Sequence, residues 1–151
     1  MGVTLIIIKN SRVARKNYEI LEHTADIRIL VKAKTKEELF KNCALAMFDI
    51  LAEQTEEVLN LEKINIVQKE ESLEELFVNW LNELLSMCWT KKIIFIDFDI
   101  LELDNKQIKA VAIGTKFDNY KLNTEIKAAT YSDLEIKQID KLWQAKVIFD
   151  V

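Results

Sequence analysis

The side chains of this sequence with the clearest capacity for chemistry are a few acids and one histidine. The segment EHTADIR holds His23, the only histidine of the chain, three positions before Asp26. Asp150 is the second-last residue and precedes Val151. Carboxylate and carbonyl oxygens are the ligands that Ca²⁺ and Mg²⁺ prefer. If the first and last strands are neighbours in a sheet, Asp26, Asp150 and the terminal carboxylate of Val151 converge and predict a hard-cation site.

The same residues also have a purely structural interpretation, and their spacing leaves both interpretations open. In the structural one, Asp26 caps a turn, Asp150 is a solvated residue of the tail, and His23 is a hydrogen-bonded side chain rather than a ligand or an orienting group. Asp97 and Asp99 alternate along the run KIIFIDFDI, which is more typical of a solvated strand face than of a site.

Other kinds of enzymatic chemistry have little support. The histidine accompanies no GxSxG, no glycine-rich phosphate loop and no CxxC, so no nucleophile and base form an evident pair. Cys43 and Cys88 match no zinc spacing and fall on apolar helical faces, which predicts buried free thiols. We expect a cytoplasmic protein that is not itself an enzyme. A stand-alone metal-dependent phosphatase or nuclease is a further hypothesis, which incubation with nucleotide and RNA alone tests.

The net charge and the hydropathy of the chain limit the kinds of partner that it can bind. The chain carries 25 acidic and 21 basic side chains, a formal charge of −4, which argues against strong direct binding of nucleic acid. The apolar run at 3–8 is too short for a membrane span and precedes its basic residues, unlike a signal peptide. Residues 1–17 form an N-terminal extension whose structure the sequence leaves open: an extra strand, a frayed tail or a mis-assigned start.

Two capping boxes separate strands from helices. Alternating apolar residues predict extended structure at 18–21 and 27–33, as two strands or one bent strand interrupted by HTAD. TKEE at Thr35 and SLEE at Ser72 each offer a hydroxyl to the amide three residues on. Apolar residues at steps of three and four then predict helices to about residues 53 and 89. A half-buried strand pattern at 58–70 lies between them.

Everything after Lys91 has the period of strands. Four alternating runs, two of them joined by a turn at Asp104 and Asn105, predict a meander of about four strands. The economical architecture is α+β, with an antiparallel or mixed β-sheet and two α-helices packed on one face in a single-domain sandwich. We assign this domain to residues 18–151.

Four segments of the chain, in order, resemble the archease family. The first is YEILEHTADIRILVKAKTKEELFKNCALAMFDIL, which has the family's tyrosine-led strand, HTAD element, second strand and capped helix. SLEELFVNWLNELL is similar to the family's second helix, TEIKAATY to its KA-x-TY strand, and KVIFDV to its ending, where an aspartate stands next to last. Together these segments cover nearly all of residues 18–151, and the resemblance implies a small α+β protein.

The resemblance also implies a function, which composition does not show. Archeases assist the GTP-dependent RNA ligase of tRNA splicing, promoting guanylylation of the ligase's own histidine and supporting multiple turnover. The implied partner is therefore that ligase, which uses the GTP, and the implied role is that of a non-catalytic protein cofactor. The alternative from another class is a small-molecule or protein-binding α+β module that uses no metal.

Carried over by position, the family's metal pocket falls on Asp26, Asp150 and Val151, with Ca²⁺ as the first expectation for the cation and Mg²⁺ as the second. The supporting positions of the family fall on His23, Glu125 and Lys127. The sequence departs from the family's pattern near this pocket. Arg28 replaces a common glycine and places a cation there, and Ser132 replaces a common histidine and removes a potential ligand. Thr115 stands where an acid is common.

Overall fold

The computed structural model describes residues 18–23, 26–58 and 60–151, with Glu22 and His23 described by their backbone alone. The extension at residues 1–17, and the alternatives for it, lie outside the described residues. In chain order the elements are β1 (Tyr18–His23), β2 (Asp26–Ala33), α1 (Lys36–Leu51), β3 (Ala52–Gln54), β4 (Glu62–Lys69), α2 (Leu73–Lys91), β5 (Ile93–Leu103), β6 (Gln107–Lys116), the 3₁₀ helix η2 (Phe117–Asn119), β7 (Tyr120–Leu122), β8 (Ala128–Ile139) and β9 (Leu142–Asp150).

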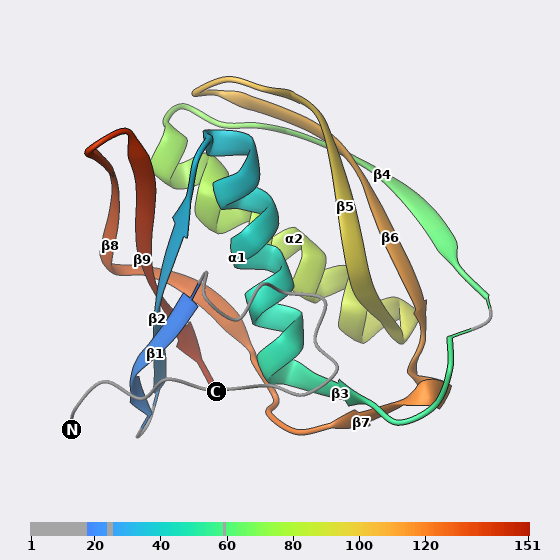
Figure 1. Cartoon of the computed structure of the whole chain (residues 1–151). Coiled ribbons are helices and arrows are strands. Elements are labelled where there is room, and N and C mark those ends of the chain that lie inside the picture. Colours follow the sequence, from blue (N-terminus) through green and yellow to red (C-terminus); the bar gives the residue numbers. More distant parts are fainter. Residues whose placement is uncertain (1–17, 24–25, 59) are drawn as a thin grey trace.

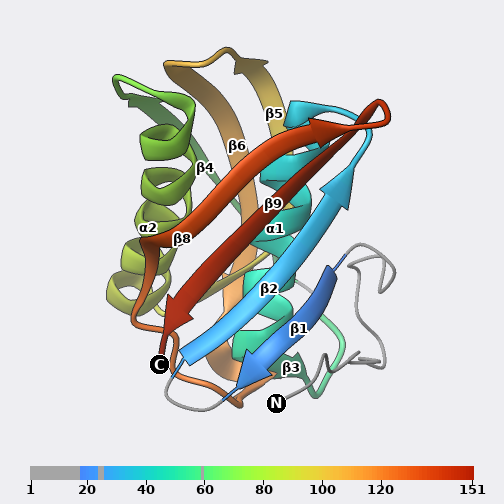
Figure 2. The same ribbon diagram turned by 90° about the vertical axis from the view of Figure 1, so that its left-hand side faces the viewer.

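Two sheets enclose the helices (Figures 1 and 2). The four-stranded sheet has the order β1-β2-β9-β8 and the three-stranded sheet the order β4-β6-β5, while β3 and β7 pair separately. All described strand pairs are antiparallel. The α+β sandwich with two helices is thus confirmed, and the structure adds a second sheet on the far side of α1. The interrupted stretch at 18–33 forms two strands rather than one bent strand.

The predicted carboxyl-terminal meander is wrong, because its strands divide between the sheets. β5 and β6 form a hairpin that joins β4, whereas β8 and β9 form a hairpin that joins β2. The reason lies in α1, whose buried residues extend around most of its surface, from Leu39 through the run Cys43–Phe48. A helix that is apolar on two sides needs a layer on each side.

Both helices begin at the predicted caps. The Thr35 hydroxyl accepts from the Glu38 amide at 3.1 Å, and the Ser72 hydroxyl accepts from the Glu75 amide at 3.2 Å. The Glu38 carboxylate reaches back to the amide of Lys34 at 3.3 Å, one residue earlier than the usual capping box. Neither α1 nor α2 combines the length and apolar character that crossing a membrane requires.

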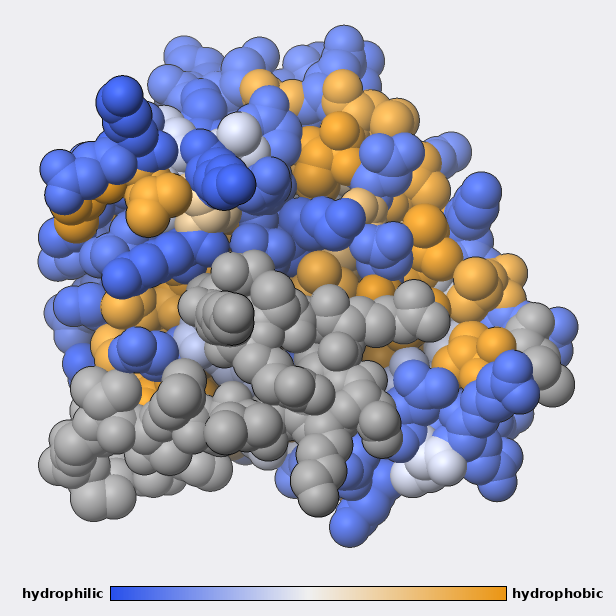
Figure 3. Space-filling view, viewed as in Figure 1, coloured by the Kyte–Doolittle hydropathy of each residue, from blue (hydrophilic) through white to orange (hydrophobic). Residues whose placement is uncertain are grey.

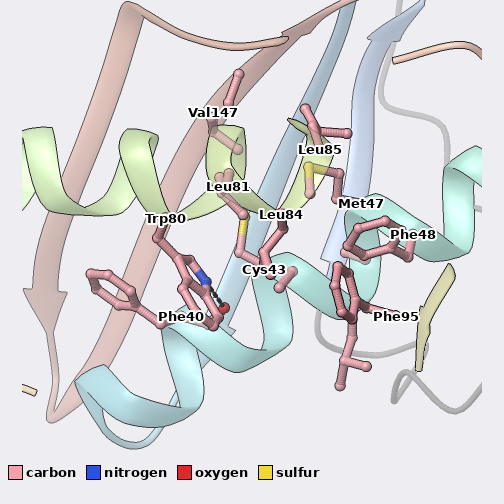
Figure 4. Close-up of a cluster of buried hydrophobic side chains, with 14 of the residues drawn as sticks. Phe40, Cys43, Met47, Phe48, Trp80, Leu81, Leu84, Leu85, Phe95 and Val147 are labelled. Carbon is pink, nitrogen blue, oxygen red and sulfur yellow. Dashed lines mark hydrogen bonds between the residues drawn. The ribbon is translucent and has the colours of Figure 1, made fainter. Parts of the chain in front are cut away.

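The core between the sheets is aromatic and sulfur-containing (Figure 4). The Trp80 indole of α2 donates to the Phe40 carbonyl of α1 at 3.0 Å, which satisfies a buried donor and fixes the two helices to each other. Cys43 and Cys88 are buried free cysteines, as predicted. Burial raises the pKa of the Cys43 thiol far above its ordinary value and that of Cys88 to about 12, the latter against a smaller lowering by Lys92.

Candidate metal centre on the four-stranded sheet

Asp26 and Asp150 lie directly opposite each other across β2 and β9, and Ala128 of β8 is the next partner of Asp150. We call these three positions, Asp26, Asp150 and Ala128, the aspartate row. The condition set for this convergence, that an early strand and the last strand are neighbours, is met by β2 and β9. Residues separated by more than 120 positions therefore bring two carboxylates to one end of one sheet.

Strand alternation determines which way these acids point. β2 buries Ile27, Ile29 and Val31, and β9 buries Val147 and Phe149, all against the helices. Successive side chains of a strand point to opposite faces, so the even-numbered residues of both strands lie on the open face. Among the described residues no helix covers that face (Figure 2). The half-buried Asp26 and the exposed Asp150 are accessible there.

The pairing of two acids is electrostatically unfavourable by itself. Directly opposite side chains have Cβ atoms about 5 Å apart. Two like charges at that separation repel by roughly 1–3 kcal/mol, depending on how well water screens them. The row therefore favours a bound cation, whether it comes from the protein or from solution.

The protein supplies one such cation in Arg28, two residues after Asp26 on the same face of β2. Its Nε lies 3.7 Å from Asp26 Oδ1, and its terminal Nη1 donates to Asp133 Oδ2 at 3.3 Å. Arg28 thus places a positive charge beside Asp26. Ile148, the direct β9 partner of Arg28, is only 4% exposed although it belongs to the open face.

Asp133 is a residue that the sequence analysis missed. It lies in an irregularity of β8 where the register against β9 shifts between Thr130 and Glu135, and its φ of 53° is in the left-handed region. Aspartate tolerates this backbone conformation better than most residues. The alternation of TYSDLE breaks at the Ser-Asp pair, which is the only signal in the sequence for a bulge that re-aims a side chain.

The supporting residues differ in how closely they contact the aspartate row. The Lys127 amide donates to the Asp150 carbonyl at 2.8 Å, so its backbone holds Asp150 from the β8 side. Glu125 is exposed beyond the buried Ile126, whose carbonyl accepts from the Trp89 indole at 3.1 Å. The side chain of His23 lies outside the described residues. The side chain of Val151 packs against the core, next to the row.

α2 anchors the third strand of the row through Asn82. Its amide oxygen accepts from the Ala129 amide at 2.7 Å, and its amide nitrogen donates to the Ala129 carbonyl at 3.0 Å. A side chain thereby takes the place of a neighbouring strand at the edge of β8. An asparagine within the apolar run WLNELL was the available signal for this contact.

The donors of the row suit a hard cation and not a soft one. Within the part of the chain that the structure describes, no group of three or more His, Cys, Asp or Glu side chains could hold a metal. Two carboxylates with neighbouring backbone oxygens are oxygen ligands of the kind that Ca²⁺ or Mg²⁺ combines with water. Such a set would leave several coordination positions to water or to a ligand carrying phosphate.

Comparison with known proteins identifies relatives over most of the chain. The model of the archease protein family matches residues 18–151. Archeases of Methanosarcina mazei and Methanosarcina barkeri are 39% and 41% identical over 142 residues, which are 90% of this chain and 97% of each relative. The solution structure of Methanobacterium thermoautotrophicum protein 1598 has a TM-score of 0.70 at 27% identity, covering 90% of this chain and 99% of that one.

A second solved structure shares the fold at lower identity. It is the crystal structure of an archease from Thermotoga maritima, described as a possible chaperone, with a TM-score of 0.62 at 24% identity. That comparison covers 87% of this chain and 94% of the other. The match of the family model and the identity with the methanosarcinal relatives are sufficient for assignment: this chain belongs to the archease family.

Proposed function

We propose that this protein activates the GTP-dependent RNA ligase of tRNA splicing, as a protein cofactor that promotes guanylylation of the ligase's histidine and supports multiple turnover. The observation that carries the proposal is the direct opposition of Asp26 and Asp150 in a chain of the archease family. Two acids held opposite each other on an open sheet face are unfavourable for folding alone. A functional role explains their position better than a structural one.

In this proposal the aspartate row binds a hard cation, Ca²⁺ or Mg²⁺, through the two carboxylates and the backbone oxygen of Val151. When bound, such an ion supplies positive charge and open positions for phosphate oxygens. Asp26 and Asp150 provide the negative charge, and the Lys127 amide holds the Asp150 backbone in register. Without a cation, the paired acids would repel a nucleotide phosphate.

The protein's charge favours action on a protein partner over direct action on RNA. A formal charge of −4 disfavours tight contact with a nucleic acid backbone, whereas an open sheet face is accessible to a folded ligase. The description of the Thermotoga maritima relative as a possible chaperone points in the same direction. A small cofactor of this kind would assist the ligase without being consumed.

The test is ligation by the cognate ligase with GTP, in single and multiple turnover, with and without this protein. The intact protein is expected to stimulate, and Asp26→Asn and Asp150→Asn are expected to lose most of that stimulation while remaining folded, with a melting midpoint in chelator no lower than that of the intact chain. Asp99→Asn is the matched control, because Asp99 is an exposed strand acid opposite Val111 rather than opposite an acid. Full stimulation by both row variants would refute the cation site, and no stimulation by the intact protein would favour the metal-free binding module.

A further inference from the structure

The contacts of Arg28 connect the aspartate row to the β8 bulge. Arg28 and Asp26 are two residues apart on the open face of β2, and their side chains are 34% and 31% exposed. Asp133, two strands away, has a 67% exposed side chain. The guanidinium therefore lies between two carboxylates, one inside the candidate metal centre and one outside it.

The two contacts are unequal. The Nε of Arg28 is 3.7 Å from Asp26, beyond hydrogen-bond distance, whereas its Nη1 makes a hydrogen bond of 3.3 Å to Asp133. A guanidinium carries five donors in a rigid fork that suits two-point contact with a carboxylate. It can therefore give up the weaker contact with Asp26 and strengthen the one with Asp133 through a small side-chain rotation.

We propose that Arg28 is a built-in competitor of the divalent cation at the aspartate row, and that Asp133 is the acceptor that holds its guanidinium when the cation binds. This inference rests on the cation site of the proposed function and concerns how that site is regulated. In the absence of a divalent cation, the guanidinium offsets part of the repulsion between Asp26 and Asp150. A cation that reaches Asp26 must displace this charge, so Arg28 lowers the affinity of the row.

The movement of the Arg28 guanidinium from Asp26 toward Asp133 would also affect the structure around Asp133. The bulge that contains Asp133 interrupts the pairing of β8 with β9 immediately after Thr130, on the strand that also carries Ala128 of the row. A tighter contact of Arg28 with Asp133 would fix the bulge against β2 across β9. Occupation of the row would thus order a surface segment beside it, in the way that a ligand favours one of two arrangements.

The experiment is calorimetric titration of CaCl₂ and, separately, MgCl₂ into the intact protein, Arg28→Gln, Asp133→Asn and a control, Lys32→Gln. Lys32 lies on the same face of β2, four residues and about 13 Å further along the strand, beyond the screening length of about 10 Å at 0.1 M salt. Arg28→Gln and Lys32→Gln change the net charge equally, so their difference isolates the local effect.

Arg28→Gln is expected to tighten cation binding roughly fivefold to tenfold. Asp133→Asn is expected to weaken binding roughly twofold to threefold, because it removes the carboxylate that draws the guanidinium away from Asp26. Lys32→Gln is expected to remain within about twofold of the intact protein. Arg28→Lys retains the charge and serves as the second variant, with an affinity close to that of the intact protein. Melting curves in chelator check that each variant is folded.

Two results would overturn the proposal in distinguishable ways. If the intact protein binds a cation and Arg28→Gln binds no more tightly than Lys32→Gln, the competition is refuted while the cation site stands. If neither the intact protein nor any variant binds Ca²⁺ or Mg²⁺, both the competition and the cation part of the proposed function fail.

Discussion

On the open face of the three-stranded sheet an acid lies opposite a base, whereas on the open face of the four-stranded sheet two acids lie opposite each other. Glu102 of β5 and Lys109 of β6 are direct partners joined by an ion pair of 3.2 Å. Asp26 and Asp150 are likewise direct partners across β2 and β9, but both are acids. Opposite charges at such positions are stabilising and like charges destabilising. The first sheet follows the rule for stability, and the second departs from it where we place the site.

The three-stranded sheet also exposes apolar side chains. Apolar surface gathers over the region of β5 and β6 in Figure 3, and Leu101 of β5 and Val67 of β4 are 59% and 58% exposed. Asp97 of β5 forms an ion pair with Lys41 of α1 at 3.2 Å, and its side chain is 49% exposed, in keeping with the solvated position predicted for it. The three-stranded sheet therefore shows how this protein arranges charged strand residues that stabilise the fold.

The largest effect on stability is expected from Gly114→Ala in β6 of the three-stranded sheet. A Cβ at this position would lie 2.8 Å from the Ile94 carbonyl oxygen and 2.9 Å from two carbons of Ile93. Overpacking of this kind costs about 1–3 kcal/mol. Denaturant unfolding should show this loss, and Val111→Ala on the open face of the same strand should lose less. A loss of the cation response with no loss of stability would contradict the assignment of separate roles to the two sheets.

Alkaline pH is expected to weaken both sheets together, because both pack on helices that carry the buried thiols. Burial raises the folded-state pKa of Cys43 and Cys88, and burial together with Asp49 raises that of Tyr18. Their stabilising contribution is fully present below the unfolded pKa values, about 8.5 for Cys and 10 for Tyr. It decreases as pH rises toward the folded values, by up to about 1.4 kcal/mol per pH unit for each thiol.

Unfolding monitored between pH 7 and pH 10 measures this decrease. Cys43→Ala and Cys88→Ala each remove one titrating thiol, so each should flatten the decline even though both variants start from a lower stability. A free energy of unfolding that stays constant to pH 10 would be inconsistent with two buried thiols.

Neutralising one acid should change the free energy of unfolding in opposite directions in the two sheets. Asp150→Asn in chelator is expected to raise the free energy of unfolding by about 0.2–1 kcal/mol, because it removes a like-charge pair. Glu102→Gln is expected to lower it by about 0.2–0.5 kcal/mol, because it breaks an exposed pair. Urea titrations at low salt compare the two variants directly, and the difference should shrink in 1 M salt. If both variants change the free energy of unfolding in the same direction, the proposed difference between the two sheets is wrong.

The sequence predicted those features that follow from short-range chemistry. The hydroxyls of Thr35 and Ser72 cap the helices, and the Asp104 carboxylate accepts from the amides of Lys106 and Gln107 in the predicted turn. The convergence of Asp26 and Asp150 was predicted only on the condition that their strands are neighbours, and the pairing of β2 with β9 meets that condition.

The features that the sequence did not predict depend on long-range partners. Apolar and polar residues alternate in the same way in β5, β6, β8 and β9, whichever sheet each strand joins. The alternation therefore does not show that these strands form two hairpins in different sheets rather than one meander. Asp133 is 105 residues from Arg28, and only the bulge of β8 brings them together. Asn82 gains its role from the unpaired edge of β8, which does not exist before the sheet forms.

The most direct test of the central claim is the melting midpoint of the intact protein and of Asp150→Asn, each measured against increasing Ca²⁺ and Mg²⁺. A ligand that binds only the folded state raises the midpoint with concentration. We expect a rise for the intact protein and little or none for Asp150→Asn, which starts higher in chelator. An equal rise for both proteins, or no rise for either, would contradict the assignment of the aspartate row as a hard-cation site.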